Sequence, residues 1–201
     1  MRTGLSAVLF DFGGVLAEEG FRDTLAALAV EQALPADLPK QGMRAVYDSG
    51  FVLGQGTAAD FWALLRERTG LQGDDEFLTT RVLKAFVPRP WMLALVRKLR
   101  ADGYITGILS DQTDWLDRLD EQYHFFCAFD RIYNSYYLGK GKRDRSLFAD
   151  VAADLKMPPS AILFVDDNAD NVARARDAGY QAIYFTGREA FLAALETALS
   201  G

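Results

Sequence analysis

The chain has 201 residues, of which 50% are hydrophobic and 25% charged, with a formal net charge of −6 at pH 7. A chain of this length can bury a core as one domain with an insertion, or as two small domains. Its basic residues are scattered, which argues against the broad positive surface of a nucleic-acid-binding protein. No apolar run is long enough to cross a membrane, and the first residues lead straight into a strand with no room for a signal peptide. We therefore expect a cytoplasmic protein with no nucleic-acid or membrane partner.

Histidine and cysteine each occur once, as His124 and Cys127, next to Phe125, Phe126 and Phe129. A single cysteine forms no internal disulfide, and its aromatic neighbours predict a packed, inert thiol. One histidine argues against a His-rich metal site and against a histidine-based triad, so we expect a packing role for it as well.

The first predicted strand is the apolar run 7–10, which ends at Asp11 and is followed by Phe12, Gly13 and Gly14. Such a run is typical of a strand covered on both faces in a parallel sheet. Ligands of these sheets bind at the carboxyl ends of the strands, where glycines let the backbone approach an anion. Taken alone, the motif fits equally well an aspartate that ends a strand before a Gly-Gly turn.

Residues 17–86 show helical patterns and no good strand. One helix runs through Phe21 and Leu28 towards Pro35 and Pro39, and another extends from about residue 74 or 75 to about Phe86. Between them, a capping box at residues 57–60 opens a helix that closes at Gly70. We interpret this stretch as an all-helical insertion of about four helices, with residues 1–16 and 87–201 as the core.

After Pro88, helical and strand-like segments alternate. The expected helices are 90–100, one through residues 115–119, 144–155, 168–178 and 189–199, and the expected strands are 104–109, 131–134, 161–165 and 182–185. Alternation of this kind implies right-handed crossovers and a three-layered α/β fold with a Rossmann-like parallel sheet.

Two of these strands end on polar residues, and a basic loop lies between them in the sequence. Ser110 and Asp111 follow one strand, Asp166 and Asp167 end another, and the loop carries Lys140, Lys142 and Arg143. A carboxylate nucleophile, a hydroxyl, an ammonium and an acidic pair are the groups that phosphoryl transfer through an aspartyl-phosphate needs. Taken singly, the serine fits a turn, the acidic pair fits a helix start and the basic loop fits a solvated surface.

With these four segments in this order, the chain resembles the haloacid dehalogenase (HAD)-like hydrolase superfamily, and specifically its phosphatase-like members with a helical (C1-type) cap inserted after the first motif. The resemblance runs from about Leu5 to Thr186, judged from the apolar strands and motif spacing. It implies that Asp11 is the nucleophile and that Ser110 and Lys142 are also catalytic, with Lys140 as the alternative lysine.

The same resemblance implies the residues that bind phosphate and metal. Those implied for phosphate are Gly13, Gly14, Ser110, Asp111 and Lys142. Those implied for Mg²⁺ are Asp11, the carbonyl of Gly13, Asp166 and Asp167, the last acting through a metal-bound water or by orienting Lys142, and Asn171 is implied to support their loop.

Three positions depart from the common family pattern. Gly13 stands where phosphatases usually have a second aspartate that protonates the leaving group, which leaves Glu18 or Glu19 to supply the proton or simply to form a solvated linker. Asp111 replaces an asparagine, and we expect it to cap the next helix. Arg143 and Arg145 replace prolines, and we expect them at the surface.

These observations favour a Mg²⁺-dependent phosphatase of a small phosphorylated metabolite, such as a sugar phosphate, acting as a monomer or weak homodimer. A metal-independent dehalogenase and a non-catalytic binding protein, the latter suggested by Gly13, are the alternatives. Among cap residues, Arg44 and Tyr47 are candidate substrate contacts, whereas Phe51 and Trp62 fit packing better.

Overall fold

The computed structural model describes residues 4–200 of the chain, so residues 1–3 and 201 of the predicted core segments lie outside it. At its centre is a parallel sheet of five strands within the described residues, in the order β3-β2-β1-β4-β5. The strands are β1 (Ala7–Phe10), β2 (Ile105–Ser110), β3 (Arg131–Asn134), β4 (Ile162–Asp166) and β5 (Gln181–Tyr184). Each was predicted to within one residue at either end. Because β1 is hydrogen-bonded to β2 on one side and β4 on the other, Asp11, Ser110 and Asp166 reach the same edge of the sheet.

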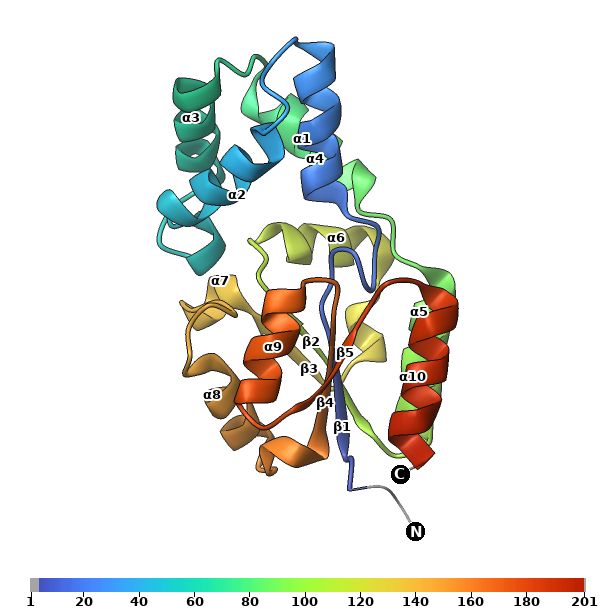
Figure 1. Cartoon of the computed structure of the whole chain (residues 1–201). Helices are drawn as coiled ribbons and strands as arrows, with labels where there is room; N and C mark the ends of the chain where they lie inside the picture. The colour runs from blue at the N-terminus through green and yellow to red at the C-terminus, as the bar shows by residue number, and fades with distance from the viewer. Residues whose placement is uncertain (1–3, 201) are drawn as a thin grey trace.

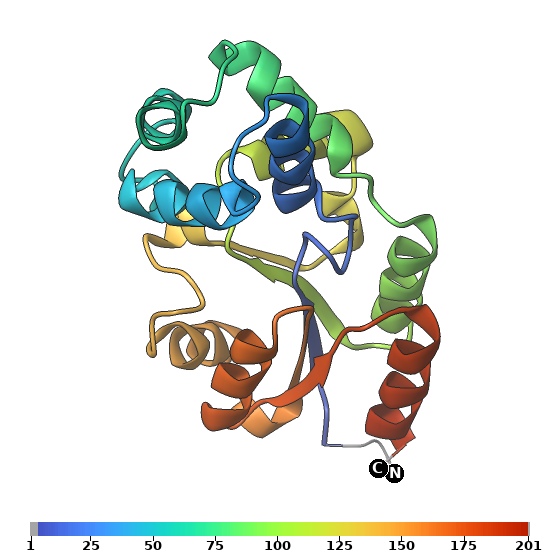
Figure 2. The same ribbon diagram turned by 45° about the horizontal axis from the view of Figure 1, so that its top comes forward.

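Helices cover both faces of this sheet, as predicted (Figures 1 and 2). Residues of β1 alternate between the two faces: Val8 and Phe10 belong to one buried cluster, and Ala7 and Leu9 to the other. The first cluster includes side chains of α5 (Pro90–Ala101) and α10 (Arg188–Ser200), and the second those of α8 (Leu147–Leu155) and α9 (Ala169–Asp177). The period of two along β1 is what a strand buried on both faces produces.

Beyond the carboxyl ends of the strands lie four helices from the segment predicted to be helical (Figure 1). They are α1 (Gly20–Glu31), α2 (Leu38–Asp48), α3 (Ala58–Thr69) and α4 (Asp75–Ala85), with the 3-10 helix η1 (Phe51–Leu53) after α2. Thr57 and Asp60 form the predicted capping box of α3, and Gly70 ends it in the left-handed conformation. Pro39, expected to mark a helix end, instead lies in the first turn of α2, where its missing N–H is not needed.

Two linkers join these helices to the sheet, and they are hydrogen-bonded to each other. The N–H of Glu18 donates to Val87 over 3.0 Å, and the N–H of Arg89 donates to Leu16 over 2.8 Å. The guanidinium of Arg89 also donates to the carbonyls of Gly14 and Val15, at 2.6 and 2.8 Å. The two linkers of the helical segment are therefore held together next to the loop that follows Asp11.

Several local features differ from the sequence-based expectations. His124 does not pack in a core: it is exposed and ends α6 (Trp115–Tyr123) with a φ of 52°. Cys127 is also exposed: it lies in the short 3-10 turn η2 (Phe126–Ala128), whereas Phe125 and Phe129 on either side of the turn are buried. The helix α7 (Ser135–Leu138) and the short 3-10 helix η3 (Pro159–Ala161) were not predicted. No helix in the described part of the chain is long and apolar enough to span a membrane.

Candidate active site

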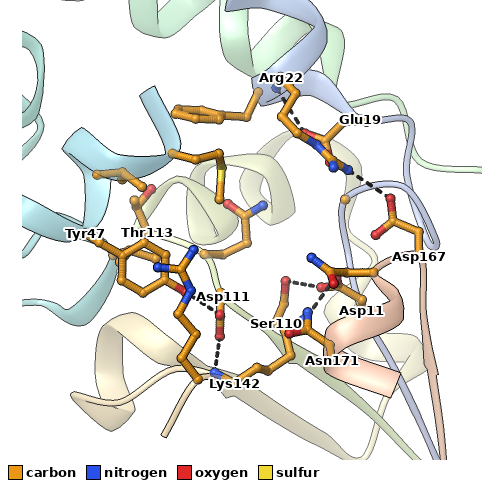
Figure 3. A pocket seen from close by; sticks show the side chains of 18 of the residues that line it. Asp11, Glu19, Arg22, Tyr47, Ser110, Asp111, Thr113, Lys142, Asp167 and Asn171 are labelled. Carbon is orange, nitrogen blue, oxygen red and sulfur yellow. Dashed lines mark hydrogen bonds and ion pairs between the residues drawn. The ribbon is translucent and has the colours of Figure 1, made fainter. Parts of the chain in front are cut away.

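A cavity of about 270 Å³ opens between the carboxyl edge of the sheet and the helices α1 and α2 (Figure 3). Asp11, Ser110, Lys142 and Asp167, which come from four separate segments of the sequence, all line it. The structure thus brings together the residues that the sequence selected from each motif. This edge is where ligands of parallel sheets bind.

Asp11 is held on both sides by hydrogen bonds. Its Oδ1 accepts from the N–H of Phe12 at 2.8 Å and from the hydroxyl of Ser110 at 2.6 Å, and its Oδ2 lies 2.8 Å from Nζ of Lys142. Burial raises the pKa of Asp11 to about 8, against the opposing effect of the Lys142 ammonium. A carboxylate that is fixed in direction but costly to ionise is suited to attack an electrophile once cations surround it.

Lys142 bridges Asp11 to Asp166. Its side chain is only 2% exposed, and Nζ lies 2.7 Å from Oδ2 of Asp166. Burial by itself would lower the pKa of Lys142, but the two ion pairs outweigh that effect and raise it. Asp166 in turn accepts from the N–H of Asn168 at 2.7 Å and from the amide of Asn171 at 3.1 Å, the supporting contact expected of Asn171. The carboxylate that orients Lys142 is therefore Asp166, whereas Asp167 was one of the expected partners.

Asp11, Asp166 and Asp167 form an acidic cluster whose oxygen atoms lie within 4.8 Å of one another. Asp167 is paired with Arg22 of α1 at 2.9 Å, and burial raises its pKa while Arg22 opposes the rise. When all three are ionised, these carboxylates outnumber the two cations that contact them, Lys142 and Arg22, and leave an excess of negative charge on hard oxygen donors. This donor set fits Mg²⁺, which prefers carboxylate oxygens and retained waters.

The two glycines after Asp11 have separate structural reasons. Gly14 has a φ of 79°, and a Cβ there would stand 2.3 Å from a carboxylate oxygen of Asp167, so a side chain would both strain the backbone and displace the acidic cluster. At Gly13, a Cβ would lie 3.2 Å from Oε2 of Glu19. Glu19 therefore occupies the region into which a side chain at position 13 would project.

The two glutamates proposed as proton donors separate in the structure. Glu19 lines the cavity, pairs with Arg22 at 3.0 Å and caps the N-terminus of α1. Glu18 does not line the cavity and pairs with Arg89. Hydrogen bonding to Arg89 holds the pKa of Glu18 below its usual value. Of the two, only Glu19 is placed to face a substrate.

Asp111 does not cap the following helix, which corrects the expectation. Its carboxylate accepts from the N–H of Lys142 at 2.8 Å and from the hydroxyl of Tyr47 at 2.5 Å (Figure 3). The hydroxyl of Thr113 instead accepts the N–H of Trp115 at the start of α6. Asp111 thereby joins the basic loop to α2, and burial together with this carboxylate raises the pKa of Tyr47.

The remaining candidates divide between the cavity and its surroundings. Tyr47 lines the cavity, whereas Arg44 is exposed outside it and Phe51 and Trp62 are buried in the helical core. Lys140 is bonded to Asp150 and Ser146 rather than to Asp11, and Arg145 is exposed. Arg143 is exposed too, yet it lines the cavity and stacks over the Tyr47 ring at 4.2 Å.

Other cavity residues were not identified from the sequence. They are Phe21, Arg22, Met43, Val46, Val52, Gln112, Thr113, Trp115, Asn168, Asp170 and Arg174. For Met43, Val46 and Tyr47 a signal existed, because positions i, i+3 and i+4 share one helix face. That spacing does not tell what the helix face packs against, however, and only the position of α2 in the structure shows that the face lines the cavity.

The chain has an α/β fold with a parallel sheet, and an aspartate, a lysine and an acidic pair lie at one edge of that sheet. The family model for haloacid dehalogenase-like hydrolases matches residues 5–179, and the chain belongs to that family.

Among curated proteins, the sesquiterpene phosphatase astK of Aspergillus oryzae is 25% identical over 188 residues, which is 92% of each chain. The drimenol cyclase drtB of Aspergillus calidoustus is 40% identical over 60 residues, which is 30% of this chain and 11% of the cyclase. Among solved structures, a HAD family enzyme of Bacteroides thetaiotaomicron in complex with magnesium and inorganic phosphate has a TM-score of 0.71 at 20% identity, covering 94% of this chain and 98% of that one. At this identity the structural match speaks for the fold.

Proposed function

We propose that the protein is a Mg²⁺-dependent phosphatase that hydrolyses a small phosphate monoester through an aspartyl-phosphate on Asp11. The observation that carries the proposal is the Asp11 carboxylate, bonded to Ser110 and Lys142 within the acidic cluster. Asp11, Asp166, Asp167 and the carbonyl of Gly13 would hold the ion, which would neutralise the repulsion between the carboxylate and the phosphate when bound.

In the first step, an oxygen of Asp11 attacks phosphorus in line and the bond to the ester oxygen breaks. Lys142 favours the ionised form of Asp11 and balances charge on the phosphoryl group. Ser110 lies 2.6 Å from Asp11, so its hydroxyl can turn to donate to a phosphoryl oxygen. In the second step water attacks the acyl phosphate, which releases phosphate and restores Asp11.

The departing alkoxide needs a proton, and Gly13 has no side chain to supply one. We assign this role to Glu19, because its Oε2 lies 3.2 Å from the position that a Cβ at residue 13 would take. In the second step the same carboxylate would take a proton from the attacking water.

Two features disfavour the alternatives. Dehalogenation by an aspartate has no use for a metal, yet two further carboxylates accompany Asp11. A binding protein that had lost catalysis would have no need of a buried lysine paired to both Asp11 and Asp166.

The phosphatase among the relatives supports a phosphate ester as substrate, and its name adds terpene phosphates to the sugar phosphates that the sequence suggested. We further propose that residues 17–86 act as a C1-type cap that closes the cavity, and that the protein works in the cytoplasm as a monomer or weak homodimer.

Phosphate release from p-nitrophenyl phosphate, with Mg²⁺ and with a chelator, tests the proposal. Asp11→Asn should lower the rate by at least about 10³-fold, since the nucleophile acts as a unit with its partners. Asp150→Asn, an exposed acid on α8, is the control and should behave like the parent. Undiminished release by Asp11→Asn, or release that ignores the chelator, would refute it.

A further inference from the structure

We infer that the alcohol part of the substrate is apolar, so that the natural substrate is a phosphate ester of a short alkyl or alkenyl alcohol rather than of a sugar. This inference rests on the proposed phosphatase function and specifies its substrate class. It follows from which side chains face Asp11 across the cavity and from which of them have hydrogen-bonding capacity to spare.

The wall of the cavity opposite the phosphate-binding end carries five apolar side chains. Its apolar members are Phe21 from α1, Met43 and Val46 from α2, Val52 from η1 and Trp115 from α6. The helices that contribute them pack over the carboxyl edge of the sheet (Figure 1). A leaving group attached to phosphate at Asp11 and extending away from the sheet would meet these side chains.

Polar side chains on the same helical wall already have partners. Among the described residues 19–52 that line the cavity, they are Glu19, Arg22 and Tyr47. Arg22 bonds to Glu19 and Asp167, and the Tyr47 hydroxyl donates to Asp111 (Figure 3). Glu19, moreover, is needed for the ester oxygen itself.

This arrangement discriminates against sugars. A sugar carries several hydroxyls, and each one buried without a partner weakens binding by about tenfold or more. Spare hydrogen-bonding groups among the described lining residues belong to Gln112, Arg143, Asp170 and Arg174, which come from the core segments and not from the helical wall that the alcohol would meet. The cavity of about 270 Å³ is also at the small end for a ligand site, which favours a compact chain.

A ladder of ethyl, butyl and hexyl phosphates tests the inference, with glucose 6-phosphate as the competing class. We expect kcat/KM to rise by about fourfold for each added methylene until the wall is covered. The kcat/KM for glucose 6-phosphate should be lower than that for butyl phosphate. A flat ladder, or a preference for the sugar, would overturn the inference.

Variants locate the effect on the wall. Val46→Thr keeps the shape but adds a hydroxyl, and it should lower kcat/KM for hexyl phosphate by about fivefold while sparing acetyl phosphate, which is too short to reach the wall. Val30→Thr, at an exposed position of α1, is the matched control. If Val46→Thr does not fold, the partly buried Met43→Gln serves the same purpose. Equal losses for hexyl and acetyl phosphate would contradict a role in recognising the alcohol.

Failure of the phosphatase function is distinguishable from failure of this inference. If acetyl and p-nitrophenyl phosphates are not hydrolysed, the proposed function fails, and calorimetric titration with ethyl, butyl and hexyl phosphonates then decides the ligand class. Affinity that rises with chain length supports an apolar ligand. Affinity that is independent of chain length, or weaker than that for glucose 6-phosphate, rejects it.

Discussion

Asp11 and Asp166 share the single ammonium group of Lys142 in a site that is almost closed to water. The side chain of Lys142 is 2% exposed and that of Asp166 is fully buried. The charges of Lys142 and Asp166 are therefore balanced by each other and not by solvent. Such an arrangement contributes little to stability, because desolvation consumes most of the attraction. Its value is in fixing the direction of Asp11 and in leaving the site with an excess of negative charge for a cation.

The raised pKa of Asp11 predicts how the metal-free protein responds to pH. Because folding raises this pKa from 3.8 to about 8, the folded state holds the proton more tightly, and stability from this group falls as pH rises across that interval. The slope reaches about 1.4 kcal/mol per pH unit. Asp11→Asn should flatten the slope and unfold at higher urea than the parent near about pH 8, measured in a chelator.

Asp150→Asn is again the control and should retain the parent slope. Added Mg²⁺ should stabilise the parent strongly and Asp11→Asn weakly. A parent slope that persists unchanged in Asp11→Asn would show that Asp11 is not the group that titrates.

Glu19→Gln separates proton donation from the other steps. Alkyl phosphates have poor leaving groups and should lose about 10² to 10⁴ in kcat, because the alkoxide must be protonated as it departs. p-Nitrophenolate leaves without a proton, so the first turnover of p-nitrophenyl phosphate, measured as a burst of p-nitrophenolate, should be affected little. Later turnovers should slow, because Glu19 also takes the proton from the attacking water. Glu18→Gln, one residue away and paired with Arg89, should leave both rates near those of the parent. An equal loss in the first step for both substrates would place Glu19 in positioning rather than in acid catalysis.

Sequence reasoning reached Asp11, Ser110 and Asp166 because each ends a strand or follows one, and parallel strands bring those ends to one edge. Lys142 lies in a loop after α7 and was assigned from the family resemblance. Sequence reasoning offered Asp167 as one possible partner of Lys142, whereas Asp166 holds that position, since the direction that each adjacent carboxylate faces from the strand end cannot be read from the sequence. Asp111 was misjudged for a related reason: a carboxylate after a strand has local donors in the next helix, but the Lys142 N–H and the Tyr47 hydroxyl lie 31 and 64 residues away.

Among the helices, α2 is joined to the edge of the sheet by a hydrogen bond to Asp111, which directly follows β2. The Tyr47 hydroxyl reaches Asp111, which also holds the N–H of Lys142. This element was the one of the four helices not identified individually from the sequence, because Pro35 and Pro39 suggested an end. Gly42 then lets α2 approach α1 closely, since a Cβ there would stand 2.2 Å from Leu25.

Tyr47→Phe removes this hydrogen bond and should lower both the stability of the protein and its kcat/KM. We expect a loss of about 1.5 kcal/mol in the free energy of unfolding, typical of a hydrogen bond to a charged group, and roughly a tenfold lower kcat/KM from less exact placement of Lys142. Tyr137→Phe also removes a tyrosine bond to an aspartate, Asp117, but outside the cavity. If the two variants lose activity equally, the contact of α2 has no specific part in catalysis.

At the scale of the whole molecule, sheet and helical segment form one continuous hydrophobic cluster on one face. Val8 and Phe10 of β1 belong to the same buried cluster as Leu25, Phe61 and Trp62 of the helices. Alternation of strands and helices predicted the sheet, because the spacing of apolar residues in each segment indicates either a strand or a helix. The seating of the helices on the sheet was not predictable, because it depends on side chains far apart in sequence that periodicity does not pair.

Arg89 connects the linkers of the helical segment to the loop that follows Asp11. It donates to the carbonyls of Gly14 and Val15, pairs with Glu18, and lies over the Phe185 ring at 5.3 Å, so it joins the first loop, both linkers and the segment after β5. Because the side chain is 17% exposed, its replacement leaves carbonyls with little access to water. Arg89→Met should therefore cost about 3 kcal/mol in urea unfolding and weaken the response to Mg²⁺ by displacing the loop after Asp11. Arg97→Met, at an exposed position of α5, should do neither. Equal stability of the two variants would mean that the linkers hold their places through their backbone hydrogen bonds alone.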